Sequence, residues 1–126
     1  MTAKKSDGEY TKADFNQLAQ AIRRHVIAMD GVAGIRGNVW ERVKDSFSRH
    51  RRRSFDGIVL VETDKEFWIA ISVIAAYGTV LPQLATKIQE ELRHLCHAHA
   101  VQHPVSVRVF IDNVVLVEKN EQKIIT

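Results

Sequence analysis

The sequence predicts an α+β fold, a two-layer sandwich in which helices cover one face of a small, mostly antiparallel sheet. Apolar residues recur at helical spacing before residue 50 and after residue 80, whereas they alternate between residues 57 and 76 and again from residue 105. The chain has 126 residues, 45% of them hydrophobic, which suits one domain. We expect this domain at residues 11–118, between a disordered N-terminal tail (1–10) and a C-terminal tail (119–126).

The first helix is expected at about residues 12 to 29. Thr11 can cap the free amides at its start, and Asp30-Gly31 ends it. Its apolar face consists of Phe15, Leu18, Ala19, Ile22 and Val26. The segment "GVAGIRG" (31–37) contains three glycines and is expected to be a loop. A short second helix follows at about residues 38 to 49, and its apolar face consists of Val39, Trp40, Val43 and Phe47. The run "RHRRR" (49–53) then forms a loop.

Strands follow from residue 57. "GIVLVET" and "EFWIAISVIAA" are rich in β-branched residues and, with "DK" as the turn between them, predict an antiparallel hairpin. A helix from about residue 80 has an apolar stripe of Leu81, Leu84, Ala85, Ile88, Leu92 and Leu95. Residues 105–112 alternate again as a last strand, and "VVLV" (114–117) can add a short one. The expected order is therefore α-α-β-β-α-β.

Tyr77, Gly78 and Pro82 join the long strand to the helix after it. Gly78 can supply a backbone angle that other residues avoid, and Pro82 fits the first turn of a helix, where its missing amide hydrogen costs nothing. The segment contains no nucleophile and no paired carboxylates. We interpret it as a structural corner rather than a ligand site.

One face of the predicted sheet has apolar residues that the helices leave uncovered. In the long strand this face holds Trp68, Ala70 and Ile74, and in the last strand it holds Phe110, next to Arg108. Aromatic residues among polar ones are typical of protein interfaces. We therefore expect this face to bind a second copy of the chain or another protein.

A basic cluster suggests an anionic partner as an alternative. The chain has a net charge of +3, and four of its arginines stand close together at Arg49, Arg51, Arg52 and Arg53. They can contact phosphates or an anionic membrane surface, can steer the approach of a protein partner, or can form a solvated loop. The overlapping "GVAG" and "GIRG" in Gly31–Gly37, with Arg36 inside, also resemble the GxxG loop with which KH-type modules clamp nucleic acids.

Histidines crowd the end of the third predicted helix, where metal binding is the alternative to a structural role. On a continuing helix, Cys96, His99 and His103 would share one face, and His94 and His97 lie nearby. The spacing matches no established zinc signature, and Pro104 ends the helix directly after His103. Histidines also interact favourably with the negative end of a helix. We therefore expect no metal site and no cofactor.

Composition and motifs argue against several other classes. No apolar run reaches the roughly 20 residues of a membrane-spanning helix, and no secretory signal follows the N-terminus, so we expect a cytosolic protein. Cys96 is the only cysteine, which fits a reducing compartment. Cys96 lies on or beside the apolar stripe near the helix end, where a free cysteine usually behaves as a small hydrophobic residue. Ser72 has no histidine partner at a local spacing that would make it a nucleophile. We therefore expect no catalytic residues and no enzyme activity.

Most of the chain resembles the alkaline shock protein family of bacteria, also called the Gls-type envelope stress response family. The resemblance covers roughly residues 12 to 117. It rests on the valine-rich hairpin, on "VSVRVFIDNVVL", on "MDGVAGI", and on the corner and helix residues Tyr77, Gly78, Leu81, Pro82 and Gln89. The chain departs from the family pattern at Arg108, where many members have asparagine, at "AVQHP" before the last strand, and at the basic "RHRRR".

This resemblance implies a function without catalysis. Members are regarded as cytosolic, non-enzymatic proteins that assemble with themselves or reach the membrane through a separate anchoring protein. It gives no catalytic residue to transfer to this sequence. We therefore expect a binding or scaffold protein of the envelope stress response, in the cytoplasm and peripheral to the inner face of the membrane through its partner. A KH-like nucleic-acid-binding module is the alternative.

Overall fold

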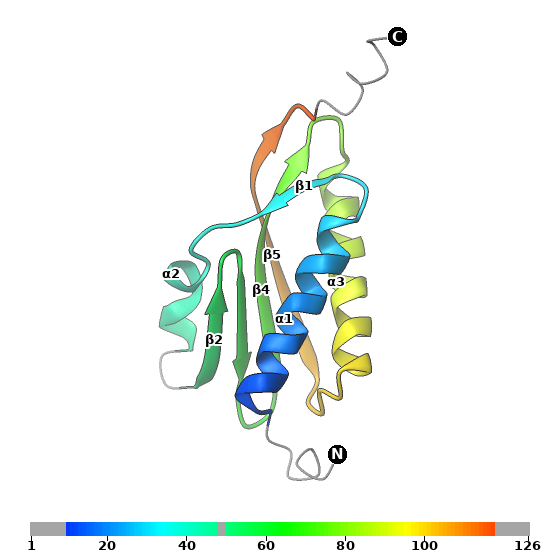
Figure 1. Ribbon diagram of the computed structural model, residues 1–126. Helices are drawn as coiled ribbons and strands as arrows, with labels where there is room; N and C mark the ends of the chain where they lie inside the picture. Colours follow the sequence, from blue (N-terminus) through cyan, green and yellow to red (C-terminus); the bar gives the residue numbers. More distant parts are fainter. Residues whose placement is uncertain (1–9, 48–49, 118–126) are drawn as a thin grey trace.

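The computed structural model describes residues 10–47 and 50–117, and this part of the chain forms an α+β domain (Figure 1). Its elements in chain order are α1 (Lys12–Ile27), β1 (Val32–Ile35), α2 (Trp40–Val43), the 3₁₀ turn η2 (Lys44–Ser46), β2 (Arg51–Phe55), β3 (Ile58–Glu62), β4 (Phe67–Ala76), α3 (Leu81–Ala98) and β5 (Val105–Val115). The five strands form one sheet.

β4 is the centre of this sheet and pairs with three other strands. β5 runs parallel to it from Phe67↔Val105 to Ala76↔Val115, with a bulge in β5 where the register shifts between Val73 and Ile74. On the other edge of β4, β3 pairs antiparallel with the first half and β1 pairs antiparallel with the second half. β2 lies beyond β3 and is antiparallel to it. The sheet is therefore mixed, with α3 as the crossover between the two parallel strands.

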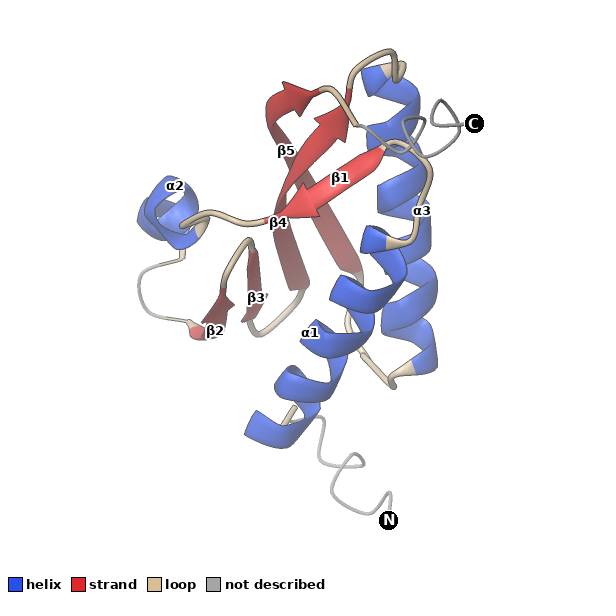
Figure 2. Ribbon diagram, turned by 45° about the horizontal axis from the view of Figure 1, so that its top comes forward, coloured by secondary structure: helices blue, strands red, loops and turns tan. Residues whose placement is uncertain are grey.

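The main core lies between the sheet and the pair α1 and α3, which cover the same face (Figure 2). The largest buried side chains in it come from both helices and from the sheet: Phe15, Leu18, Ile22, Val26, Ile88, Leu92, Ile58, Leu60, Ile69 and Ile71. The predicted start of α1 is confirmed. Asp14 N–H donates to Thr11 Oγ1 at 3.0 Å, and Thr11 N–H donates to Asp14 Oδ2 at 2.8 Å, which together form a capping box.

A second, smaller core lies on the opposite face of the sheet. There Val39, Val43 and Phe47, from α2 and the segments beside it, pack against side chains of β3 and β4: Val59, Val61 and Ala70. Figure 2 shows α2 on the side of the sheet away from α1 and α3. β3 is consequently covered on both faces, which explains why "IVLV" has no polar residue in alternate positions.

The predicted order of elements is wrong at two places. "VAGI" was expected as part of a glycine loop but forms β1, in which Gly34 packs against the Ile74 side chain. "RRRSF" was expected to begin as a loop but forms the edge strand β2, in which arginines occupy both faces. The expectation that helices cover only one face is also wrong, because α2 lies on the other face.

The N-terminal boundary needs a correction at one residue. Tyr10 was expected to belong to a disordered tail, but it is buried between Phe15 and Phe67, with ring centroids at 5.3 and 5.4 Å. Its hydroxyl donates to the His99 carbonyl at 2.7 Å and so connects the start of α1 to the end of α3. Burial raises the pKa of this phenol. The rest of both predicted tails, residues 1–9 and 119–126, lies outside the described residues.

Candidate partner-binding surface

The residues predicted to bind a partner lie together on the face of the sheet that carries α2. β4 contributes Trp68, Ala70 and Ile74 to this face, and β5 contributes Arg108 and Phe110, with Arg108 opposite Ala70 in the register. α2 already covers Ala70, which is buried in the second core. Trp68, Ile74 and Phe110 stay partly exposed, and Arg108 is exposed.

Three arginines stack on three aromatic rings on this face. The guanidinium carbon of Arg42 lies 4.2 Å from the centre of the Phe110 ring, and that of Arg52 lies 4.0 Å from the Trp40 ring. Arg108 lies 5.7 Å from the Trp68 ring. We call these six residues the arginine–aromatic face. Cation–π contacts of this kind hold the arginine side chains in place beside apolar surface.

Trp68 lies at the rim of an open hollow within this face. Its ring packs 5.3 Å from the Phe47 ring, and its indole N–H donates to Glu66 Oε1 at 2.6 Å. Next to it is a hollow of about 570 Å³, whose lining includes Phe47, His50, Lys65 and Arg108. The hollow therefore offers an aromatic floor with charged groups of both signs around it.

A carboxylate connects α2 to the two central strands. Asp112 on β5 accepts hydrogen bonds from the Ser72 hydroxyl and from Arg42, and the Arg42 contact is also an ion pair. These two hydrogen bonds, the one from Ser72 first, lower the pKa of Asp112 below its ordinary value. Sequence reasoning missed this contact, because Arg42 and Asp112 are 70 residues apart and neither belongs to a recognisable motif.

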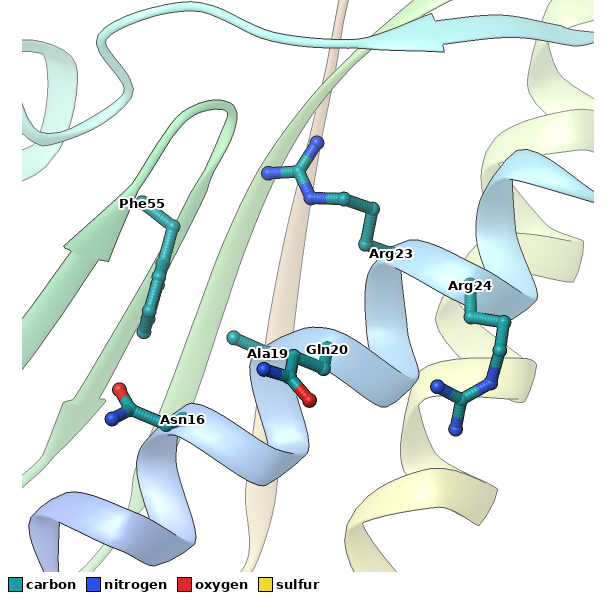
Figure 3. A pocket seen from close by; sticks show the side chains of 6 residues that line it. All are labelled: Asn16, Ala19, Gln20, Arg23, Arg24 and Phe55. Carbon is teal, nitrogen blue, oxygen red and sulfur yellow. The ribbon is translucent and has the colours of Figure 1, made fainter.

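A second groove lies on the other side of the sheet, between α1 and the edge strand β2 (Figure 3). Its volume is about 490 Å³, and it is lined by Asn16, Ala19, Gln20, Arg23, Arg24 and Phe55. Figure 3 shows Phe55 pointing from β2 toward α1. Arg23 reaches away from the groove to the carbonyls of Ile35, at 3.3 Å, and Asp56. The groove offers amides and a cation but no carboxylate or nucleophile.

The structure disperses the predicted basic cluster over both faces of β2. Arg51 is paired with Glu62, donates to the Tyr10 carbonyl and lies 5.4 Å from the Phe15 ring. Arg52 points to the opposite face, over Trp40. Arg53 is partly buried, Arg36 is exposed beyond β1, and Arg49 lies outside the described residues. Among the described arginines there is thus no single basic patch at β2.

The segment Gly31–Gly37 does not form the loop that a KH-type clamp requires. Its middle is β1, paired with β4. Backbone amides near its end are already engaged, since Arg36 N–H donates to the Ser72 carbonyl at 3.3 Å and Gly37 N–H donates to Asp56 Oδ1 at 2.8 Å. These amides cannot bind a phosphate without breaking the structure, so the nucleic-acid alternative has no support here.

The predicted corner is present at Tyr77, Gly78 and Pro82. Gly78 has a φ of +94°, and Pro82 is in the first turn of α3. Tyr77 is 73% exposed, which the sequence did not indicate. It stands beside β5, because Tyr77 N–H donates to the Val115 carbonyl at 2.8 Å. The corner is therefore architectural in its backbone and leaves an aromatic side chain in solvent.

The histidine-rich end of α3 is not arranged as a cluster. α3 ends at Ala98, so Cys96, His99 and His103 do not continue on one helical face. Within residues 10–47 and 50–117, no group of three histidine, cysteine, aspartate or glutamate side chains is placed to hold a metal ion. Cys96 is buried, which raises the pKa of its thiol to about 12.

Comparison with known proteins gives a match to a protein family. The model of the alkaline shock protein 23 family, described as having a cell envelope-related function, matches residues 4–116. No curated protein and no solved structure gives a significant match. Among the described helices, none is both long and apolar enough to cross a membrane.

Proposed function

The chain belongs to the alkaline shock protein 23 family, and from this membership and the surface described above we propose that it is a non-enzymatic scaffold that acts by binding other proteins. The family match covers nearly the whole domain and confirms the resemblance seen in the sequence. The family description itself states a function related to the cell envelope, and the scaffold role is our proposal.

The arginine–aromatic face is the observation that carries the proposal. Tryptophan and arginine are the residues most enriched where protein interfaces concentrate their binding energy. Here Trp68 and Phe110 are partly exposed, each with an arginine held over its ring, and Trp68 also lines an open hollow. Because the arginines are already ordered, a partner that covers the face loses less side-chain entropy on binding.

The proposed partners are a second copy of the chain and a membrane-anchoring protein, as the family resemblance implies. In this proposal the chain works in the cytoplasm, and contact with the inner face of the membrane is made through the anchoring partner. The stacked arginines also suit a partner surface that carries carboxylates, since a guanidinium over a ring keeps its N–H donors available at the rim.

The absence of catalysis belongs to the same proposal. The two residues that the sequence offered as candidate nucleophiles, Cys96 and Ser72, are both buried. The Cys96 thiol is buried and protonated at neutral pH, and the buried Ser72 hydroxyl donates to Asp112. Both residues therefore support the fold rather than a reaction.

Replacing Trp68 by glutamate tests the proposal in the cells of origin. Trp68→Glu puts a carboxylate into this face, so the share of the chain that co-sediments with the envelope fraction should fall about tenfold or more, as expected for an interface aromatic worth about 2 kcal/mol. Tyr77→Glu is the matched control, because it introduces the same charge at an exposed aromatic outside the face.

Circular dichroism of both purified variants shows whether the fold is retained. The proposal is contradicted if Trp68→Glu keeps its native spectrum and still follows the envelope fraction as the wild-type chain does. It is also contradicted if the wild-type chain shows no envelope association that depends on another protein.

A further inference from the structure

β5 is an edge strand, and its outer side pairs with no other strand in the described part of the chain. It runs for 11 residues without a proline or a lysine, and its alternation is regular from Val105 to Ile111, before a bulge at Asp112 where the register with β4 shifts. A long strand edge with free amides is a template for pairing with another chain, and natural proteins commonly block such edges with lysine or proline. The outer edge of β5 up to this bulge is therefore a candidate site for strand addition.

The backbone groups that point outward from β5 can be assigned from one contact. Phe67 N–H donates to the Pro104 carbonyl at 2.9 Å, so Pro104 directs its carbonyl toward β4. Because the direction alternates along a strand, Val105, Val107, Val109 and Ile111 direct their amides and carbonyls away from β4. The bond from Gln89 Nε2 on α3 to the Val107 carbonyl, at 3.3 Å, agrees with this assignment.

The sequence of β5 is charge-complementary to itself. Residues 108–112 read Arg-Val-Phe-Ile-Asp, with opposite charges at equal distances from Phe110. When two copies of this segment are aligned antiparallel about Phe110, Arg108 of each copy lies opposite Asp112 of the other. Cross-strand pairs of opposite charge stabilise a sheet, and a two-fold interface uses each such pair twice.

We propose that two copies of the chain associate through antiparallel pairing of their β5 strands, centred on Phe110. This inference rests on the proposed function of assembly and names the surface and the partner, which is a second copy of this chain. In this register Val109 lies opposite Ile111 of the other copy, and these are the residues whose amides point outward. They exchange the backbone hydrogen bonds, while the two Phe110 rings meet in a non-hydrogen-bonded pair, where side chains approach closely.

The register is compatible with the contacts that β5 already makes. The Gln89 bond to Val107 lies outside the paired segment and can persist. Asp112 keeps enough exposed surface to accept a bond beyond those from Ser72 and Arg42, since its side chain is 37% exposed and a carboxylate has about four acceptor positions.

An exchange of charges tests the pairing directly. In Arg108→Asp, two copies would place aspartates opposite each other twice, and in Asp112→Arg they would place arginines opposite each other twice. Each variant alone should self-associate about tenfold more weakly than the wild-type chain, measured by light scattering over a range of protein concentrations. An equimolar mixture of the two variants should regain association, because every charged pair across the two strands is then of opposite sign.

A cysteine variant tests the same register without changing Asp112. Phe110→Cys places two thiols opposite each other at the two-fold axis, so mild oxidation should give a covalent dimer. Ser54→Cys, on the exposed edge strand β2 at the other side of the sheet, is the control and should give little. Cys96 can stay in place because it is buried.

Three outcomes would overturn the pairing. It is wrong if the mixture of charge variants fails to associate and Phe110→Cys gives no more dimer than Ser54→Cys. It is also wrong if the wild-type chain and both single variants associate equally, a result that moves self-assembly to another surface and leaves the proposed scaffold function intact. A wild-type chain that stays monomeric at every concentration excludes the pairing, while co-sedimentation with the envelope then decides the proposed function independently.

Discussion

Two glycines with positive φ show how differently a single missing Cβ can matter. Gly78 has a φ of +94°, and a Cβ there would have no heavy atom within 4 Å. Gly57 has a φ of +83°, and its Cβ would lie 2.7 Å from the backbone nitrogen of Arg36. At Gly78 a side chain meets only backbone strain, whereas at Gly57 it also collides with a neighbouring backbone that cannot easily move.

We predict that Gly78→Val lowers the free energy of unfolding by about 1 to 3 kcal/mol, the usual cost of an unfavourable backbone angle. Gly57→Ala should cost more than Gly78→Ala, although the added methyl group is the same. Urea unfolding of the three variants measures these differences. Gly78→Asn is a useful control, since asparagine tolerates positive φ better than valine does. If the two alanine variants lose the same free energy of unfolding, the close contact at Gly57 does not contribute to stability.

Individual residues were predictable from the sequence where they carry their own conformational signal. Gly78, Pro82 and Thr11 act through local backbone geometry, and all three lie where the sequence predicts. The roles of Tyr10 and Asp112 were not predictable. Tyr10 contacts the end of α3 and Asp112 contacts α2, and a periodicity confined to neighbouring positions contains no information about partners that distant.

Among the elements, β2 is the clearest case of a strand without a strand-like sequence. Arg51 and Arg52 point to opposite faces of the sheet, so each face of β2 presents a cation. As an edge strand, β2 needs no apolar residue in every second position, and alternation is therefore missing. β1 was equally hard to predict, because Gly34 has no side chain and so interrupts the alternation of apolar residues that indicates a strand. Their pairing partners on β3 and β4, in contrast, were predicted as strands correctly.

We predict that Arg51 stabilises the fold more than Arg52 does. The Glu62 side chain that pairs with Arg51 is only 9% exposed, so Arg51→Ala leaves a nearly buried carboxylate without its cation. This should lower the free energy of unfolding by about 1 to 3 kcal/mol. Arg52→Ala removes a stacking contact with Trp40 and should cost about 1 kcal/mol or less.

The double variant Arg51→Ala with Glu62→Gln provides the control for this comparison, because it removes the unpaired charge. Its stability should recover part of what Arg51→Ala alone loses. Thermal unfolding followed by circular dichroism measures all four proteins. If Arg51→Ala and Arg52→Ala are equally stable, the strand tolerates either arginine as a solvated side chain and the ion pair with Glu62 is not structural.

At the scale of the whole molecule, the sheet contributes side chains to two hydrophobic cores, one on each of its faces. In β3, Ile58 and Leu60 point to the main core under α1 and α3, whereas Val59 and Val61 point to the second core under α2. The fold class was predictable from the sequence because the period of the apolar residues changes between helices and strands. That α2 lies on the other face was not, because four to eight residues of helical spacing do not show which side of a sheet they cover.

This arrangement predicts that the two cores unfold together. Both tryptophans, Trp40 and Trp68, belong to the second core, so their fluorescence reports on the α2 face, whereas far-ultraviolet circular dichroism is dominated by α1 and α3. Since β3 and β4 contribute alternate residues to both cores, loss of either core exposes the strands that support the other, and urea should give coincident midpoints by the two probes. Val43→Ala, in the second core, should move both midpoints equally. A fluorescence transition at distinctly lower urea concentration, with the helical dichroism unchanged, would contradict this prediction. It would show that α2 unfolds independently and that α1 and α3 stabilise the sheet without it.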